Sequence, residues 1–420
     1  MNPPWKPAFV NGRLRSPLFA SLLVIFGLCA NASAQIQPGN ELSRSLRLQG
    51  QSQGVVTYLV MGQSNGYQLS HVSISVPSLL TAPQLAAPGL LYHTNDVNPN
   101  HFAMFGQFAD PGPTDVALFP MATLGRGLYD LEAPGTRVNM VQLCVGGSAL
   151  SLTTGEQVAT GIPAWLDPTG PMSILAQHRS TIEAFGRDSD EVRVIWIHGE
   201  TDSQLGTPGL VYAETMAKMF GAVRRWTGQD NLDVYMATLT DIPQDYGAAT
   251  EQFEAQFNEI RDAQRALHLQ RIDGVDYRIV AHTYDLVNDA DFFHFLFTER
   301  IEFASQIVNG IADSNRFFEP SQVTQQGDQL VIDLPRPTVT ATVNPFLFQV
   351  RVGGLVEPFT LSSTSTQLTL AFPPGALSGG PIQLRHVFGG GHAYGMRLNW
   401  ESGAIYSAEG EPLAPFFWTN

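Results

Sequence analysis

The sequence predicts an α/β protein with a three-layer, doubly wound parallel sheet, followed along the chain by a small C-terminal β-sandwich domain. Two observations predict this. From about residue 52 to residue 315, short runs rich in Val, Ile and Leu alternate with helix-length amphipathic segments, as in sheets that are buried between helix layers. After residue 318 the strand-like runs continue between Pro/Gly turns without any helical pattern. We therefore expect an α/β domain over residues 35–317 and a β-rich domain over residues 318–420.

The parallel sheet is predicted from five runs that are apolar on both faces. Each is short enough for a strand and is bounded by turn residues. Because strand and helix alternate along the chain, the runs belong to one sheet with helices on both sides. The expected strands are Val55–Met61, Val138–Cys144, Val192–Ile197, Leu232–Thr238 and Tyr277–Ala281.

Four amphipathic segments predict the helices between these strands. In the last of them, Ile301, Ala304, Ile307 and Ile311 fall on one face at helical spacing, and such a stripe is typical of a core-facing helix. The expected helices are Pro171–Phe185, Pro208–Arg225, Ala249–Leu267 and Phe297–Ala312.

Residues 68–115 interrupt this alternation. They are rich in Pro, Ala and Asn and show little periodicity, so we expect a long loop there. A loop of this length beside a site is usually functional, and this one could form a wall of a substrate cleft.

The first 34 residues have the pattern of a secretory signal peptide. Lys6, Arg13 and Arg15 precede an apolar run over 18–28 that is too short to span a bilayer, and Ala32-Ser33-Ala34 is a small-residue cleavage site. We expect cleavage near Ala34 and a secreted or periplasmic protein. No other apolar stretch is long enough to span a membrane.

Charge and composition exclude some partners and cofactors. The formal net charge is −15, and the leader contributes only basic residues, so the mature chain is more acidic still. An acidic protein repels a phosphate backbone, so nucleic acid is not an expected partner. The histidines lack the spacing of a metal site, and no cofactor motif is present, so no metal or cofactor is expected.

The β-rich domain is predicted from four runs, and its aromatic residues allow two interpretations. Trp400, Phe416, Phe417 and Trp418 either fill a β core, which is the commoner use, or stack on sugars. The expected strands are Gln329–Leu334, Phe346–Val352, Gln367–Phe372 and Ile382–Val387.

Polar residues follow several of the parallel strands where those strands end. Ligands bind at this edge of an open parallel sheet. The segments are Gly62-Gln63-Ser64-Asn65, Gly146-Gly147-Ser148, His198-Gly199-Glu200-Thr201-Asp202 and, before the last helix, Asp291-Phe292-Phe293-His294. Each segment alone is a weak signal, because Gly, Ser and Asn are ordinary turn residues. Together they bring a hydroxyl, free N–H groups, carboxylates and an imidazole to one rim.

These groups are the ones that acyl transfer needs. Ser64 is a poor nucleophile until a base takes its proton, and His294 can be that base. Asp291 or Glu200 can orient the imidazole and stabilise its charged form. Backbone N–H groups of Ser64 and of the Gly146-Gly147 turn can stabilise an oxyanion.

In order and spacing, the four segments resemble the blocks of the SGNH (GDSL-like) hydrolases, with their flavodoxin-like sheet. They are most similar to the sialate O-acetylesterase-like branch, which includes the carbohydrate esterase family six acetylxylan esterases. The resemblance covers about residues 52–312. It implies that Ser64 is the nucleophile and His294 the general base, that Asp291 and Glu200 are the acidic supports, and that Gly146 or Gly147 is the oxyanion-hole glycine.

One block departs from the family pattern. His198 stands where the family usually has glutamine, so its part as a further oxyanion donor is open, and it could instead shape the pocket. We further expect Gln63, Asn65 and Trp165 to contact substrate, the last as a stacking platform.

The resemblance and the signal-peptide pattern together predict a secreted serine esterase that removes O-acetyl groups from an acetylated polysaccharide or sialic acid through an acyl-enzyme. Two alternatives remain. One is a non-catalytic carbohydrate-binding or surface protein on the same fold, since fold does not imply function. The other is a lipase or arylesterase of the SGNH type. The oligomeric state is not predicted.

Overall fold

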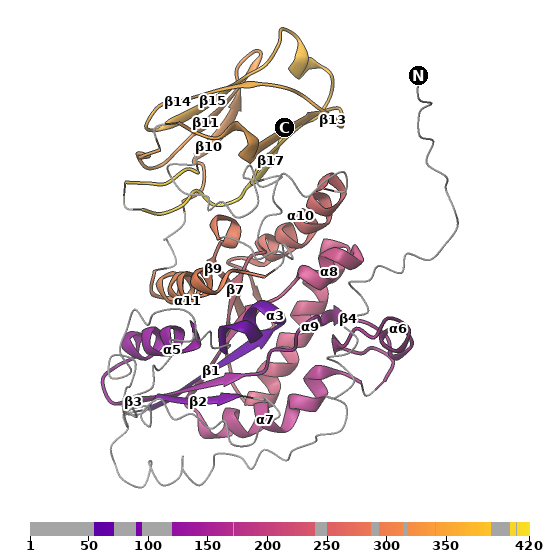
Figure 1. Cartoon of the computed structure of the whole chain (residues 1–420), viewed down its shortest axis with the longest axis vertical. Helices are drawn as coiled ribbons and strands as arrows, with labels where there is room; N and C mark the ends of the chain where they lie inside the picture. The colour runs from indigo at the N-terminus through magenta and orange to yellow at the C-terminus, as the bar shows by residue number, and fades with distance from the viewer. Residues whose placement is uncertain are drawn as a thin grey trace, which may run out of the picture.

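The computed structural model describes ten segments of the 420-residue chain: residues 54–70, 90–94, 120–170, 172–239, 250–286, 294–313, 318–340, 342–387, 404–408 and 410–420. The predicted signal peptide, Asp291 and most of the segment 68–115 lie outside these residues. Figure 1 shows an α/β part and, above it in the view, a β domain.

A seven-stranded sheet organises the α/β part, in the order β2-β3-β1-β6-β7-β9-β8. All neighbours are parallel except β8 against β9. The central strand β1 pairs Val56 with Val138 of β3 and with Glu191 of β6. The strands are β1 Gly54–Gly62, β2 Leu90–Thr94, β3 Thr136–Gln142, β6 Glu191–Ile197, β7 Leu232–Ala237, β8 Arg271–Ile272 and β9 Val275–Ala281.

Helices cover both faces of this sheet, which confirms the three-layer prediction. Leu59 and Met61 of β1 pack into a core with α7, α9 and α10, whereas Val56, Tyr58 and Val60 pack into a second core with α5 and α11. Because successive side chains on a strand point to opposite faces, one apolar strand serves both cores. The helices are α5 Pro120–Leu131, α7 Ile174–Asp188, α9 Gly209–Thr227, α10 Thr250–Leu267 and α11 Phe297–Ala312.

The five predicted strands and four predicted helices are all present, but the loop expected over residues 68–115 is not a loop throughout. It contains the short 3-10 helix η1 (Gln68–Ser70) and the strand β2, which among the described strands pairs only with β3. A strand at the edge of the described sheet needs only one partner, so its sequence carries a weaker apolar signal.

Smaller elements complete the α/β part near the carboxyl ends of its strands. Strands β4 and β5 form a separate two-stranded parallel sheet. The bounds are α3 Ser64–Tyr67, β4 Ala149–Ser151, α6 Thr154–Thr160, β5 Ala164–Leu166, α8 Glu200–Leu205 and the 3-10 helix η3 Thr283–Asp285.

The C-terminal part consists of two four-stranded antiparallel sheets, ordered β10-β11-β15-β14 and β13-β12-β16-β17. Inward side chains of both sheets share one core, so this part is the predicted small β-sandwich. The exact domain boundary remains a prediction. The strands are β10 Gln322–Gln325, β11 Gln329–Asp333, β12 Phe348–Val352, β13 Leu355–Val356, β14 Thr360–Ser363, β15 Gln367–Ala371, β16 Ile382–His386 and β17 Phe417–Thr419, with 3-10 helices η4 Pro345–Leu347 and η5 Ala376–Ser378.

Helix α10 carries much of the junction between the two parts. Arg385 of β16 makes two hydrogen bonds to the carboxylate of Asp262 on α10, at 2.8 and 2.6 Å. Arg265, one turn further along α10, donates to the carbonyl oxygen of Pro415 at 2.8 Å. The hydroxyl of Tyr284 in η3 donates to the carbonyl of Leu413 and its ring joins the β core. The β domain is therefore docked through polar and apolar contacts together.

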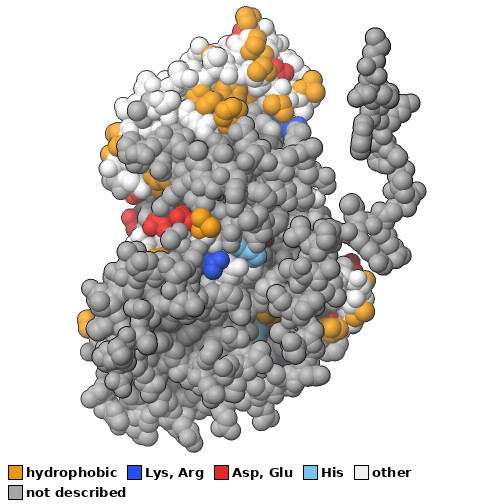
Figure 2. Space-filling model, viewed as in Figure 1, with side chains coloured by type: hydrophobic (Ala, Val, Ile, Leu, Met, Phe, Trp, Pro, Cys, Tyr) orange, Lys and Arg blue, Asp and Glu red, His pale blue; other side chains and the backbone are white. Residues whose placement is uncertain are grey.

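The aromatic residues near the end of the chain divide between core and surface. Phe416 is buried in the β core, whereas Phe417 is 39% exposed. Trp400 lies outside the described residues. Further apolar side chains are exposed on this domain, including Phe346 and Leu355, and Figure 2 shows such side chains in orange at the top of the view. No helix in the described part of the chain combines the length and apolarity that crossing a membrane requires.

Candidate functional site

The predicted nucleophile follows a turn that requires glycine. Gly62 ends β1 with φ 137°, and a Cβ there would lie 1.9 Å from the carbonyl oxygen of Ile197 at the end of β6. Without a side chain, the two strands stay close, and the backbone N–H of Gln63 donates to the same Ile197 oxygen at 2.9 Å. Ser64 then begins α3 and remains partly exposed. The local sequence thus presents Ser64 at the rim of the sheet.

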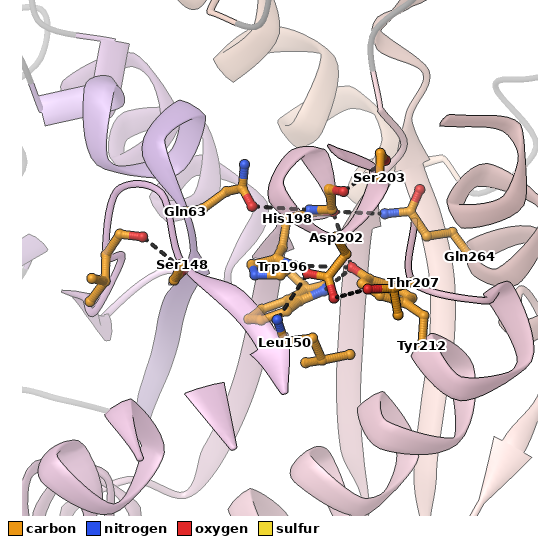
Figure 3. Close-up of polar contacts among 12 residues, drawn as sticks. Gln63, Ser148, Leu150, Trp196, His198, Asp202, Ser203, Thr207, Tyr212 and Gln264 are labelled. Carbon is orange, nitrogen blue, oxygen red and sulfur yellow. Dashed lines mark hydrogen bonds and ion pairs between the residues drawn. The ribbon is translucent and has the colours of Figure 1, made fainter. Parts of the chain in front are cut away.

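The residues on either side of Ser64 are buried. Gln63 is 2% exposed, and its Oε1 accepts a hydrogen bond from the backbone N–H of Gly199 at 3.4 Å (Figure 3). Asn65 is 1% exposed and donates from Nδ2 to Oε1 of Glu200 at 2.6 Å. Both were expected to contact substrate. The structure instead places them between the loops that follow β1 and β6, where they hold those loops together.

The glycine turn after β3 lies beside Ser64. A Cβ built on Gly146 would be 3.9 Å from the Cβ of Ser64, and Gly147 has φ 65°. The hydroxyl of Ser148 donates to the carbonyl of Val145 at 2.8 Å, which fixes the turn from within (Figure 3). A turn with little side-chain bulk beside a nucleophile leaves backbone N–H groups accessible to a developing oxyanion.

Glu200 is the buried carboxylate of the rim. It begins α8 and is 5% exposed. Burial raises the pKa of Glu200 above its ordinary range, while a backbone hydrogen bond, the hydrogen bond from Asn65 and the charge of the nearby His294 imidazole act in the opposite direction. Its second oxygen, Oε2, has no hydrogen-bond partner among the described residues. Glu200 and His294 therefore lie within electrostatic reach of each other.

His294 is partly exposed, and the residue after it is held on three sides. The backbone N–H of Phe295 donates to Oδ1 of Asn65 at 3.4 Å, and its carbonyl accepts from Nε of Arg300 at 2.9 Å. Its buried ring packs against Phe303 with centroids 5.1 Å apart. The backbone beside the predicted base is thus anchored before α11 begins.

His198 is buried beside Trp196 and Tyr212, which Figure 3 labels with it. It is 1% exposed, and its ring stacks on Trp196 with centroids 4.6 Å apart. Its Nδ1 is 3.3 Å from the hydroxyl oxygen of Tyr212, which donates to the His198 carbonyl at 3.1 Å. Burial lowers the pKa of His198 to about 3, while an interaction with the Ser148 backbone acts to raise it. Nε2 makes no hydrogen bond of good geometry within the described part of the chain. The ring is therefore neutral. It belongs to the buried side chains that lie below Ser64 and the glycine turn, which we call the floor of the site.

Asp202 ties this floor to β4. Its Oδ2 accepts from the backbone N–H of Leu150 at 2.9 Å, and its Oδ1 accepts from the hydroxyl of Thr207 at 3.2 Å (Figure 3). The carboxyl is 1% exposed, and burial raises the pKa of Asp202 to about 7. Its contacts are those of a structural support.

Trp165 does not form the exposed platform that the sequence led us to expect. It lies in β5, is fully buried, and meets Trp196 edge to face with centroids 5.3 Å apart. A ring that is enclosed by the core cannot stack on a sugar, so this expectation is wrong for the folded chain.

The structure brings most of the predicted groups to one rim but leaves some apart. No group of three or more His, Cys, Asp or Glu side chains that could hold a metal ion occurs among the described residues. Asp291 is outside them. Ser64, Gly146, Gly147, Glu200 and His294 line the rim, Gln63, Asn65 and His198 lie below it, and Trp165 is in the core.

Sequence reasoning missed the side chains that support the floor. Gln264 donates from Nε2 to the carbonyl oxygens of His198 and Ala237, at 3.1 and 3.3 Å. A signal was present, because Gln264 interrupts the apolar face that Ile260 and Leu267 share on α10. Such a polar residue on a core face needs a buried partner.

No protein-family model and no curated protein matches the chain. Among solved structures, it matches XAC1771, a novel carbohydrate acetylesterase from Xanthomonas citri, with a TM-score of 0.55 and 14% identity over 86% of this chain and 80% of that one. The protein AT4G34215 from Arabidopsis thaliana and NanS both match with a TM-score of 0.41, at 16% and 13% identity, over 62% and 63% of this chain and 99% and 98% of theirs. The chain therefore shares the α/β fold of XAC1771.

Proposed function

We propose that this protein is a secreted serine esterase that removes O-acetyl groups from a carbohydrate. The observation that carries the proposal is the meeting of Ser64, the Gly146 turn, Glu200 and His294 at one rim of the sheet. A nucleophile, N–H donors, a carboxylate and an imidazole are the groups that acyl transfer requires.

The reaction runs in two halves. The Ser64 oxygen attacks the acetyl carbonyl carbon while His294 takes the hydroxyl proton. The tetrahedral intermediate then collapses, the bond to the sugar oxygen breaks, and His294 returns its proton to that oxygen. In the second half, a water molecule gives a proton to His294 and attacks the acetyl-Ser64 carbonyl. Acetate leaves, and Ser64 recovers its proton from His294.

Backbone N–H groups stabilise the negative charge of the intermediate. The N–H of Ser64 and the N–H of Gly146 or Gly147 are the proposed donors, because the glycine turn lies beside the serine Cβ. Fixed donors do not have to reorganise as charge develops, so they favour the transition state over the bound ester.

Two carboxylates are proposed to support His294. Glu200 is supported by its electrostatic contact with the imidazole. Asp291 is supported by its position three residues before the histidine. A carboxylate in either place stabilises the imidazolium that forms in each half of the reaction.

The choice of an acetylated carbohydrate rests on two supports. The Gly-Gln-Ser-Asn and Gly-Glu-Thr-Asp segments resemble the carbohydrate branch of the family, and XAC1771, which shares the fold, is described as a carbohydrate acetylesterase. The signal-peptide pattern over residues 1–34 supports export, with a proposed mature chain that begins at Gln35.

The test is acetate release by residues 35–420 from acetylated xylan, acetylated sialic acid and p-nitrophenyl acetate. Wild-type protein and Ser64→Ala are compared with Ser305→Ala, whose hydroxyl lies on α11 and donates to the Ile301 carbonyl. We expect release that is lost in Ser64→Ala and retained in Ser305→Ala. Activity on p-nitrophenyl acetate alone would favour a simple arylesterase. No release by folded wild-type protein would refute the esterase and favour a carbohydrate-binding protein.

A further inference from the structure

We propose that Asn65 is a positioning residue that holds the carboxylate of Glu200 and the backbone beside His294 in register with Ser64. The inference rests on the proposed esterase function for its kinetic part, but its structural part can be tested without any activity. It assigns Asn65 to the organisation of the site and not to contact with substrate.

The first support is the set of contacts that one side chain makes. The amide of Asn65 donates from Nδ2 to Oε1 of Glu200 at 2.6 Å, and its Oδ1 accepts from the backbone N–H of Phe295 at 3.4 Å. Glu200 follows β6, and Phe295 directly follows His294. Because Asn65 is itself the neighbour of Ser64, a single amide joins the three segments that supply nucleophile, carboxylate and base.

The second support is burial. Asn65 is 1% exposed and Glu200 is 5% exposed, so their hydrogen bond is protected from water. A side chain with so little accessible surface cannot make more than marginal contact with substrate. A buried amide between a carboxylate and a backbone N–H also satisfies polar groups that would otherwise be costly to bury.

The third support is the orientation that this contact gives to Glu200. One carboxylate oxygen, Oε1, is taken up by Asn65, while Oε2 has no hydrogen-bond partner in the described segments. The His294 imidazole lies within electrostatic reach of the same carboxylate. Fixing one oxygen of a carboxylate limits rotation about its last bond, and so determines where the other oxygen points.

The chemistry of the bridge requires an amide. Asparagine supplies one donor and one acceptor from the same planar group. Aspartate at this position keeps the acceptor for Phe295 but loses the donor and sets a second carboxylate against Glu200. Alanine loses both contacts. This difference allows the two parts of the role to be separated by substitution.

The kinetic test compares Asn65→Ala with Asn139→Ala in the mature protein. Asn139 is equally buried on β3, but it donates to the hydroxyl of Thr57, so it controls for the loss of a buried asparagine. We expect kcat for acetate release to fall 10- to 100-fold in Asn65→Ala, with KM changed less than threefold, and to stay within threefold in Asn139→Ala.

The pH profile adds a readout that lost stability alone would not move. The hydrogen bond from Asn65 favours the ionised form of Glu200, so the pKa of Glu200 rises further without it. The proposed active form has an ionised Glu200, so it is reached only at higher pH when the pKa of this carboxyl rises. We expect the acid limb of kcat/KM to move to higher pH in Asn65→Ala and to stay in place in Asn139→Ala.

The structural test reverses the donor and the acceptor. Asn65→Asp is expected to lower Tm, whereas Glu200→Gln keeps an oxygen that accepts from Asn65 and is expected to change Tm little. The double variant N65D/E200Q is expected to recover most of the loss that Asn65→Asp causes. In the double variant, the amide introduced at position 200 donates to the carboxylate introduced at position 65. We expect its kcat to stay low, because the carboxylate beside His294 is gone. This recovery of Tm without recovery of rate would separate the link from the charge.

Each result decides the proposal. A double variant whose Tm is as low as that of Asn65→Asp would overturn the link between Asn65 and Glu200. An unmoved acid limb together with a kcat equal to that of Asn139→Ala would overturn the positioning role. If wild-type protein releases no acetate, the esterase proposal fails, and the Tm comparison alone still decides whether Asn65 holds Glu200.

Discussion

Arg385 of the β domain binds the carboxylate of Asp262 on α10 with two hydrogen bonds, at 2.8 and 2.6 Å. The guanidinium also lies over the ring of Phe417, 4.7 Å from its centroid. A planar guanidinium that faces both a carboxylate and an aromatic ring is not replaceable by lysine without loss of geometry. This pair therefore contributes direction as well as attraction to the docking of the two domains.

The first prediction concerns this junction. Arg385→Met should lower the free energy of unfolding by about 1 kcal/mol, because a partly exposed bidentate pair is screened by solvent. Urea denaturation checks this, in a double-mutant cycle with Asp262→Asn. Arg351→Met is the control, since Arg351 contacts Gln349 and Gly354 within its own domain. A coupling energy of zero between Arg385 and Asp262 would contradict the prediction.

The second prediction concerns the turn before the nucleophile. Gly62→Ala should destabilise the protein by more than about 3 kcal/mol, because φ is 137° and the new Cβ would lie 1.9 Å from the Ile197 oxygen. Gly161→Ala is the matched control, with φ 72° and no atom within 4 Å of the new Cβ. It should cost about 1 kcal/mol, the effect of a left-handed residue alone. Thermal unfolding of both variants shows whether the loss of stability in Gly62→Ala comes mainly from the steric clash of the new Cβ or from the positive φ alone.

Much of the fold was predictable from sequence because its strands are buried on both faces. Runs such as Val55–Met61 are apolar on both faces, so the sequence shows them clearly as strands. The strand β1 extends one residue further at each end than this predicted run. The edge strand β2 was missed because it pairs on one side only within the described sheet and lies in a Pro- and Asn-rich segment. An apolar run in the sequence therefore predicts a central strand more reliably than it predicts a strand at the edge of a sheet.

The site divides in the same way. Ser64 and Glu200 could be predicted as site residues because a hydroxyl and a carboxylate can take part in catalysis and because each follows the end of a strand. The burial of Trp165 and of His198 was not visible, since it depends on partners such as Tyr212 that lie elsewhere in the chain. The local sequence around an aromatic residue does not show whether a helix from a distant part of the chain will cover its ring.

The third prediction concerns the pH dependence of stability. Burial holds the pKa of Asp202 at about 7 against an ordinary 3.8. The folded state therefore binds more protons than the unfolded state between these values, and the contribution of Asp202 to stability falls as pH rises through them. Asp202→Asn, which mimics the neutral carboxyl, should match wild type near pH 4 and become more stable than wild type by up to about 4 kcal/mol at pH 8.

Denaturation of both proteins at several pH values checks this difference. The comparison is needed because His198 acts in the opposite direction. Its pKa is about 3 in the fold against an ordinary 6.5, so its contribution rises with pH over that window. The two effects nearly cancel in wild type. A stability difference between Asp202→Asn and wild type that stays constant from pH 4 to pH 8 would rule the prediction out.

The fourth prediction concerns His198. His198→Leu, which leaves no N–H donor in the side chain, should cost about 1 kcal/mol of stability through the lost stacking on Trp196 and change kcat less than about tenfold, because the ring is 1% exposed. Loss of an oxyanion donor typically lowers kcat by about 100- to 1,000-fold. Steady-state kinetics of acetate release, with thermal unfolding alongside, distinguishes the two. A fall of the larger size would restore His198 to the oxyanion hole.

The bond from the Phe295 N–H to Asn65 joins residues 230 positions apart. Ser64, the glycine turn and Glu200 come from β1, β3 and β6, which are neighbours in the sheet. The histidine arrives only with α11. During synthesis, the proposed nucleophile Ser64 therefore leaves the ribosome long before the proposed base His294. We expect a nascent chain that stops before His294 to release no acetate, so that under the proposed function the order of translation keeps the chain inactive until its α/β part is complete.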